Sequence, residues 1–141
     1  MAPTAYPRSR DAVVVDTSAL IAILLGEPER DRFIHLLADA DDPVISAATL
    51  VEASIVMLAK TGPDGVHDLD DLLTTAALRP VAVDASQAHI AREAFQRYGK
   101  GRAPAGLNFG DCFPYALAST MNRPLLFKGD DFPRTDITAA M

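Results

Sequence analysis

Several features are scarce in this sequence of 141 residues, and each scarcity disfavours a class of protein. A single cysteine, Cys112, has no partner for an intramolecular disulfide, which suits a reducing cytoplasm. No stretch approaches the roughly 18 to 20 consecutive apolar residues that a membrane-spanning helix needs. The first ten residues contain no apolar region of a secretory signal, and Pro3 and Pro7 favour a flexible arm over residues 1–11. We therefore expect one cytoplasmic domain over residues 12–141, with no membrane attachment.

Closely spaced histidines and an excess of positive charge are also missing. His35, His67 and His89 lie far apart in the chain, so no local histidine motif for a metal is present. The net charge of −6 argues against a broad nucleic-acid-binding surface. Residues 92–102 are the exception, since they hold four basic residues against Glu93 alone, and an anionic substrate could bind there. The candidate contacts in this segment are Arg97, Lys100 and Arg102.

Short apolar runs alternate with helical patterns along the chain. The run Val13–Val15 ends at Asp16, and the Thr17-Ser18 pair can cap a helix that begins near Ala19. Glycine and proline mark the other boundaries. The expected strands cover residues 13–15, 43–45, 80–83 and 124–127, and the expected helices cover about 19–25, 28–40, 47–60, 64–77, 85–98 and 110–121. Strands separated by one or two helices predict an α/β fold with a central, mainly parallel sheet.

Acidic residues stand where such a sheet places its binding sites, beyond the carboxyl ends of the strands. Asp16 follows the first expected strand, and Asp130 and Asp131 follow the last. Asp111 begins the last helix, where Asn108 could serve as the cap and leave Asp111 free. Each has an ordinary alternative: helix capping by Asp16, a dipole-stabilised acid at Asp111, and a solvated turn at 130–131.

Glu52 is the most informative acid because of its neighbours. It lies in the expected helix 47–60, beside apolar residues such as Ile55 and Val56 on the same face. A carboxylate buried on such a face is costly unless a cation or good donors meet it. No basic residue precedes Lys60 on this helix, so either a metal ion or an arginine from elsewhere must compensate the charge. Oxygen-only ligands fit Mg²⁺ or Mn²⁺, which serve phosphoryl chemistry.

Four segments resemble the ordered motifs of VapC toxins, which are ribonucleases of the PIN-domain family. They are residues 15–20 (VDTSAL), the helix of Glu52, residues 108–112 (NFGDC) and residues 126–132 (LFKGDDF). The resemblance runs from about Ala12 to Ile137 and implies a PIN fold, an α/β/α sandwich on a parallel sheet. It also implies a metal-dependent endoribonuclease acting on structured or transfer RNA, a homodimer, and a cognate VapB-type antitoxin.

The resemblance also implies roles for individual residues. The main metal ligands would be Asp16 and Asp111, and the set would be completed by Glu52 and by Asp130 or Asp131, of which Asp130 is preferred. Thr17 or Ser18 would position the first acid or the attacking water. Two features depart from the family pattern: the stretch before Val13 is about ten residues longer, and Pro114 stands where alanine is expected. A proline there fits only if the helix begins near Gly110.

Two alternatives and one further expectation accompany this hypothesis. A haloacid-dehalogenase-like phosphatase would need Asp-x-Asp, but Ser18 occupies the second position. A non-catalytic PIN-like module would bind RNA or a partner without cutting. Surplus apolar residues, among them Leu69, Leu72 and Leu73, predict self-association and an apolar groove for an antitoxin segment whose arginine would reach the acids.

Overall fold

The computed structural model describes residues 12–101 and 103–141, so the predicted arm over residues 1–11 and Arg102 lie outside the described residues. Four strands form one sheet in the order β3-β2-β1-β4. The strands are β1 (Val14–Val15), β2 (Val44–Ser46), β3 (Arg79–Val81) and β4 (Leu125–Leu126). Every pairing in this sheet is parallel, which confirms the predicted α/β class.

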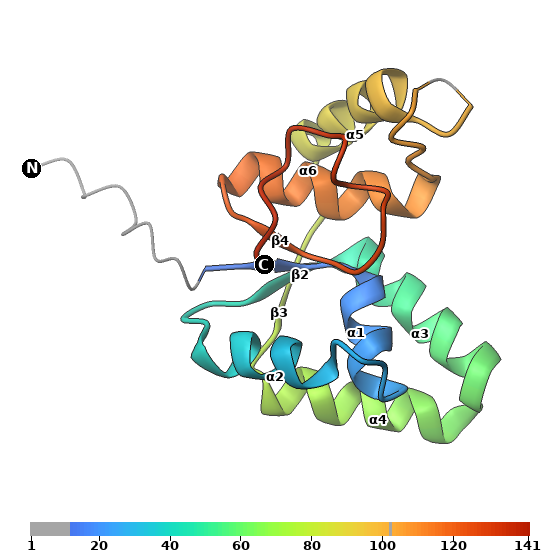
Figure 1. Cartoon of the computed structure of the whole chain (residues 1–141), viewed down its shortest axis with the longest axis vertical. Coiled ribbons are helices and arrows are strands. Elements are labelled where there is room, and N and C mark those ends of the chain that lie inside the picture. The colour runs from blue at the N-terminus through green and yellow to red at the C-terminus, as the bar shows by residue number, and fades with distance from the viewer. Residues whose placement is uncertain (1–11, 102) are drawn as a thin grey trace, which may run out of the picture.

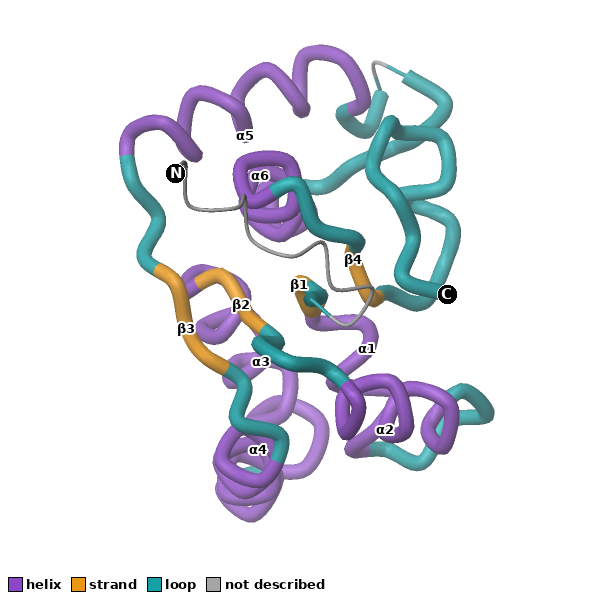
Figure 2. The backbone as a smooth tube through the Cα atoms, turned by 90° about the vertical axis from the view of Figure 1, so that its left-hand side faces the viewer, coloured by secondary structure: helices purple, strands orange, loops and turns teal. Residues whose placement is uncertain are grey.

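Helices cover both faces of the sheet, as Figures 1 and 2 show. On one face lie α1 (Thr17–Leu24), α2 (Arg30–Asp39), α3 (Ala47–Thr61) and α4 (Pro63–Thr75). On the other lie α5 (Ala85–Tyr98) and α6 (Cys112–Met121), the latter preceded by the 3-10 turn η1 (Phe109–Asp111). The architecture is therefore the α/β/α sandwich that the family resemblance implies. No helix within the described residues has the length and apolar character needed to cross a membrane.

Successive residues of β1, β2 and β4 enter opposite cores, because side chains alternate along a strand, whereas Arg79 and Pro80 of the edge strand β3 are exposed. Val15 and Ile45 join the cluster beneath α1 to α4. Val14, Val44 and Leu125 join the cluster beneath α5 and α6. Burial on both faces explains why the strands are continuous apolar runs in the sequence rather than alternating ones.

Several predicted element boundaries differ from the structure by a few residues, among them the helix predicted over 28–40, which spans Arg30–Asp39, and two of the differences have clear local reasons. Helix α1 begins at Thr17, not near Ala19, because Asp16 itself is the cap: its Oδ2 accepts from the Ser18 N–H at 3.0 Å. The third strand spans Arg79–Val81 rather than 80–83, since the chain must turn toward α5. Asp84 caps that helix by accepting from the Gln87 N–H at 2.9 Å.

The leucines of α4 do not form a surface for self-association, so that part of the prediction is wrong. Leu69 is fully buried, and Leu72 and Leu73 pack against the core cluster under α1 and α2. Pro114 is the third residue of α6, within the first turn, where the helix requires no N–H donor. Its departure from the family pattern therefore leaves the start of α6 intact.

Candidate active site

Asp16 lies at the carboxyl end of β1 and is almost completely buried, with 4% of its surface exposed. Its Oδ2 accepts from the Ser18 N–H and from Ser18 Oγ at 2.5 Å. Its Oδ1 is buried and finds no hydrogen-bond partner in the part of the chain that the structure describes. Burial raises the pKa of Asp16 to about 6 against the lowering effect of the Ser18 bonds, and the charge of Glu52 raises it further. One oxygen thus caps α1 while the other is available to a ligand.

Glu52 reaches the same point from α3. Its Oε1 accepts from the Thr17 hydroxyl at 2.6 Å, so a donor of α1 holds it beside Asp16. The expectation that Glu52 lies on a buried apolar face is wrong, because Glu52 is only half-buried and Ile55, one turn away, is 62% exposed. No buried arginine pairs with it among the described residues. The hydroxyl of Thr17 is the donor that meets the charge.

Asp111 is the third acid, at the end of η1 and directly before α6. Its Oδ2 accepts from the Asn108 N–H at 2.9 Å, so Asn108 orients this carboxylate through its backbone. Burial raises the pKa of Asp111 to about 7. The Asn108 bond opposes this shift, whereas the charges of Asp16 and Asp131 add to it. The carboxyl groups of Asp16, Asp111 and Asp131 are therefore close enough to repel one another.

The structure distinguishes the two acids that follow β4. Asp131 is half-buried and its carboxyl lies against that of Asp111. Asp130 is exposed, and it is not among the groups that shift Asp111. The Lys128 N–H donates to Ser18 Oγ at 2.9 Å, which joins this loop to the start of α1. The geometry therefore favours Asp131 over the preferred Asp130 as the fourth acid.

Gly110 is a site residue that the sequence analysis did not single out. A Cβ built at this position would overlap the Glu52 carboxylate, which packs directly over the glycine backbone. The sequence signal that could have identified Gly110 is its position directly before Asp111 in the η1 segment. Gly110 thus provides the space that Glu52 occupies, and Asp111 follows it in the chain.

The donor set fits a hard divalent cation. Four carboxyl groups from four segments gather at one edge of the sheet, and a buried oxygen of Asp16 lacks a partner. Within the described residues, no three acidic, histidine or cysteine side chains already stand close enough together to hold an ion. Ligation would require these side chains to move closer together. A cation would offset the mutual repulsion of these groups and the cost of their burial.

The predicted basic segment lies beside the turn that delivers Asp111. Leu107 closes the loop that follows α5 by bonding back to its start: its N–H donates to Tyr98 O at 2.8 Å, and its carbonyl accepts from the Lys100 N–H at 2.7 Å. Arg97 is exposed, lies 4.8 Å from the Tyr98 ring centroid and donates to its hydroxyl at 2.7 Å. Lys100 is exposed, and Arg102 lies outside the described residues.

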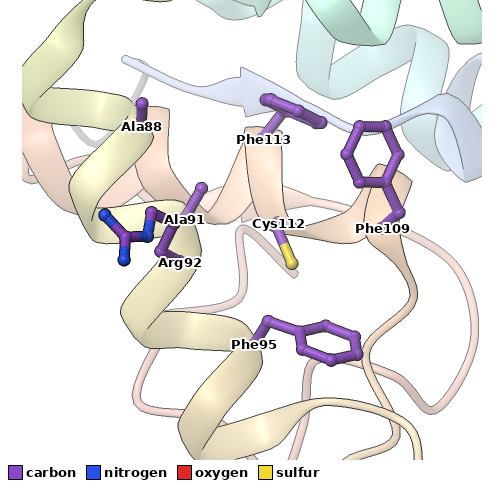
Figure 3. Close-up of a pocket in the computed structure, with 7 residues that line it drawn as sticks. All are labelled: Ala88, Ala91, Arg92, Phe95, Phe109, Cys112 and Phe113. Carbon is purple, nitrogen blue, oxygen red and sulfur yellow. The ribbon is translucent and has the colours of Figure 1, made fainter.

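An exposed apolar surface flanks the acids. Two hollows share Phe109 and Phe113: one of about 390 Å³ between α5 and α6, drawn in Figure 3, and one of about 460 Å³ beside α3 that also includes Glu52. Phe109 is 77% exposed. We call the following exposed residues the apolar face: Val51, Ile55 and Leu58 of α3, Phe95 of α5 and Phe109 of η1.

Comparison with known proteins agrees with this arrangement. The PIN domain family matches residues 13–137. A protein named ribonuclease VapC from Mycolicibacterium smegmatis is 51% identical over 129 residues, which cover 90% of this chain and 98% of that protein. VapC20 of Mycobacterium tuberculosis, described as a sarcin–ricin loop cleaving toxin, superposes with a TM-score of 0.73 at 17% identity over 89% of this chain and 96% of its own.

A second solved structure has the same fold. It is VapBC2 from Rickettsia felis bound to a DNA fragment from its promoter, and one of its chains superposes with a TM-score of 0.72 at 17% identity, covering 91% of this chain and 96% of that one. The match of the PIN family across the whole sandwich removes the haloacid-dehalogenase alternative. The chain belongs to the PIN-domain family, in its VapC ribonuclease branch.

Proposed function

We propose that this chain is a Mg²⁺- or Mn²⁺-dependent endoribonuclease and the toxin of a VapBC-type toxin–antitoxin pair. The observation that carries the metal dependence is Asp16 Oδ1, a buried carboxylate oxygen without a partner, next to further carboxyl groups. Burying several acids together without a cation is unfavourable. Hard cations prefer such oxygen ligands.

The residues that would hold the ion are Asp16, Glu52, Asp111 and Asp131. When bound, a divalent ion supplies positive charge that activates water and offsets charge on phosphate oxygens. Ser18 and Thr17 fix the directions of the Asp16 and Glu52 carboxylates through their hydroxyls. Asn108 does the same for Asp111 through its N–H. These contacts set the acids in place before a ligand arrives, which lowers the cost of ordering them.

The substrate class that we propose is structured RNA, including transfer RNA. The sarcin–ricin loop cleaving neighbour supports a structured target. Arg97 and Lys100 are exposed beside the loop that leads to Asp111, so their cations can contact phosphates next to the acids. We assign the same role to Arg102 from the sequence.

Cleavage of a structured RNA by the purified chain tests the proposal directly. We expect cutting in Mg²⁺ or Mn²⁺, none in excess chelator, and a loss of roughly 100-fold or more in Asp16→Asn and Asp111→Asn. Asp131→Asn and Asp130→Asn form a matched pair, of which only the first should impair cleavage. Full activity in chelator would contradict metal dependence, and equal loss in the matched pair would contradict the choice of Asp131.

The second candidate function is a module that binds RNA without cutting it. The clustered acids, with hydroxyl groups that orient Asp16 and Glu52, argue against this, because a module that only binds has no need of several carboxyl groups held together. Tight RNA binding by the metal-loaded chain with no cleavage of transfer or ribosomal RNA would establish it instead.

Two protein partners complete the proposal. We assign the apolar face to a second copy of the chain, since a stripe of large side chains on α3 continues onto Phe109 without a covering element among the described residues. We also propose a VapB-type antitoxin that places an arginine at the acidic site, as the toxin–antitoxin neighbours support. We expect the antitoxin to inhibit cleavage, and we expect this inhibition to weaken when that arginine is replaced.

A further inference from the structure

The segment that carries Asp131 has no helix or strand to hold it in place. We call residues 128–136 the strap; it follows β4 and consists of turns and bends. In Figure 1 the chain after β4 runs back beside α6. The position of Asp131 therefore depends on contacts between individual strap residues and the rest of the domain.

Contacts hold the strap at its start, middle and end. At the start, the Lys128 N–H donates to Ser18 Oγ at 2.9 Å. In the middle, Phe132 is buried in the α6 core, with its ring centroid 5.1 Å from that of Phe127. At the end, the Tyr115 hydroxyl donates to Asp136 Oδ1 at 2.5 Å.

Two residues of the η1–α6 segment, four positions apart, contact the strap. Tyr115 follows Asp111 by four residues, so both lie on the same side of the η1–α6 segment. Asp111 faces Asp131 of the strap, and Tyr115 faces Asp136. The first contact brings two carboxyl groups together and is repulsive when both are ionised, whereas the second is an attractive, charge-assisted hydrogen bond.

We propose that Tyr115 and Asp136 are positioning residues for the active site: their hydrogen bond holds the strap against α6 and keeps Asp131 beside Asp111 despite the repulsion between these acids. Burial and the bond to Asp136 raise the pKa of Tyr115, so the phenol remains a donor at all physiological pH values. The inference rests on the proposed function only in treating Asp131 as a metal ligand.

A purely structural role is the ordinary alternative, because a buried tyrosine hydroxyl usually finds a partner. The two explanations differ in what Tyr115→Phe does. If the Tyr115–Asp136 hydrogen bond has a purely structural role, its loss lowers the stability of the fold. A positioning bond affects metal affinity, and only as long as Asp131 is present to be positioned.

Calorimetric titration with Mn²⁺ separates them without relying on catalysis. We expect Tyr115→Phe and Asp136→Ala each to weaken Mn²⁺ binding about 10-fold, in the range typical of residues that orient metal ligands. Asp136→Asn keeps an acceptor oxygen and should bind nearly as the native chain does. Tyr98→Phe is the matched control, since its ring packs 5.9 Å from that of Tyr115 but its hydroxyl bonds to Arg97 instead.

A double variant completes the test. In an Asp131→Asn background, adding Tyr115→Phe should weaken Mn²⁺ binding no further. Unchanged affinity in Tyr115→Phe, or an equal loss with and without Asp131, would overturn the inference. A native chain that binds Mn²⁺ but leaves RNA intact would overturn the proposed function alone, whereas one that binds no Mn²⁺ would overturn both.

Discussion

Asp16 combines two roles that compete in the sequence but not in the structure. Capping and metal binding are alternatives only if one oxygen must serve both. Oδ2 caps α1 through Ser18, while Oδ1 is buried and has no hydrogen-bond partner among the described residues. A carboxylate can therefore begin the helix and still offer a ligand atom. The same buried position makes its ionised form costly in the absence of a cation.

That cost predicts how stability depends on pH in chelator. The folded-state pKa values of Asp16 and Asp111, about 6 and about 7, lie above the ordinary value of 3.8. The folded chain therefore binds protons more readily than the unfolded chain, so stability falls as pH rises from about 4 to about 7. We expect a loss on the order of a few kcal/mol between about pH 4 and pH 7, reduced from the full effect of both shifts because Asp111 is partly exposed, and measured by denaturant unfolding.

Asp16→Asn is the control for this dependence. Asparagine caps a helix as well as aspartate but carries no charge, so the metal-free variant should be more stable than the native chain near pH 8 and depend less on pH. An unchanged slope in the variant would mean that other groups cause the dependence. Saturating Mg²⁺ should stabilise the native chain at pH 8 more than it stabilises the variant.

Gly110→Ala provides a second test at the level of a single residue. The added methyl group would overlap the Glu52 carboxylate, the mobile end of a long side chain. We expect Glu52 to swing away from Thr17, with cleavage reduced roughly 10-fold or more and the free energy of unfolding changed by less than about 1 kcal/mol. If both activity and stability were unchanged, the close approach of Glu52 to Gly110 would have no functional role.

The sequence predicted the acids better than their surroundings. Asp16, Glu52 and Asp111 were identified from their positions after strands and on helices, and the structure brings them together. The choice between Asp130 and Asp131 depends on the path of the strap, which Phe132 and Tyr115 fix through contacts distant in sequence. The burial of Glu52 was overestimated because helical periodicity does not show which apolar face remains uncovered.

Elements were predicted well where local chemistry decides them. The helix 85–98 was predicted at its observed bounds, since Asp84 precedes it and Gly99 follows it. The leucines of α4 were misassigned to an interface because a sequence does not show which helices face a common core. Two-residue strands such as β1 are defined by their partners, and their bounds can be predicted only approximately.

The end of α5 carries a prediction about RNA binding. Arg97, Lys100 and Arg102 come shortly before Asp111 in the sequence, and Arg97 and Lys100 are exposed. Each phosphate contact contributes a salt dependence of about 0.7 on single strands. Replacing all three by alanine should weaken RNA binding and lower the slope of log K against log salt by about two.

Fluorescence titration at several salt concentrations measures this slope. Mn²⁺ affinity should be unchanged, because none of the three is an acid of the site. Since Arg97 also packs on Tyr98, the Arg97→Lys variant keeps the charge and serves as the control. A native slope in the triple variant would place the RNA-binding surface elsewhere.

Among the described residues, one side of the sandwich is incompletely covered. The two larger core clusters are closed by helices on either face of the sheet, yet α3 presents Val51, Ile55 and Leu58 outward at helical spacing. Phe109 extends this stripe toward α5. A contiguous surface of this kind is unusual on a monomer and typical of the centre of an interface.

We therefore expect the chain to form a homodimer through the apolar face, with the acids of each copy near the contact. Ile55→Asp places a charge where the face is 62% exposed, so it should separate the copies without disturbing the core. Leu25→Asp is the matched control, because Leu25 is also a large exposed aliphatic side chain, at 38%, but follows α1 and lines neither hollow of the apolar face. Sedimentation at tens of micromolar should show a dimer for the native chain and Leu25→Asp, and a folded monomer for Ile55→Asp. A native chain that sediments as a monomer, or an Ile55→Asp variant that remains dimeric, would assign this surface to a different partner.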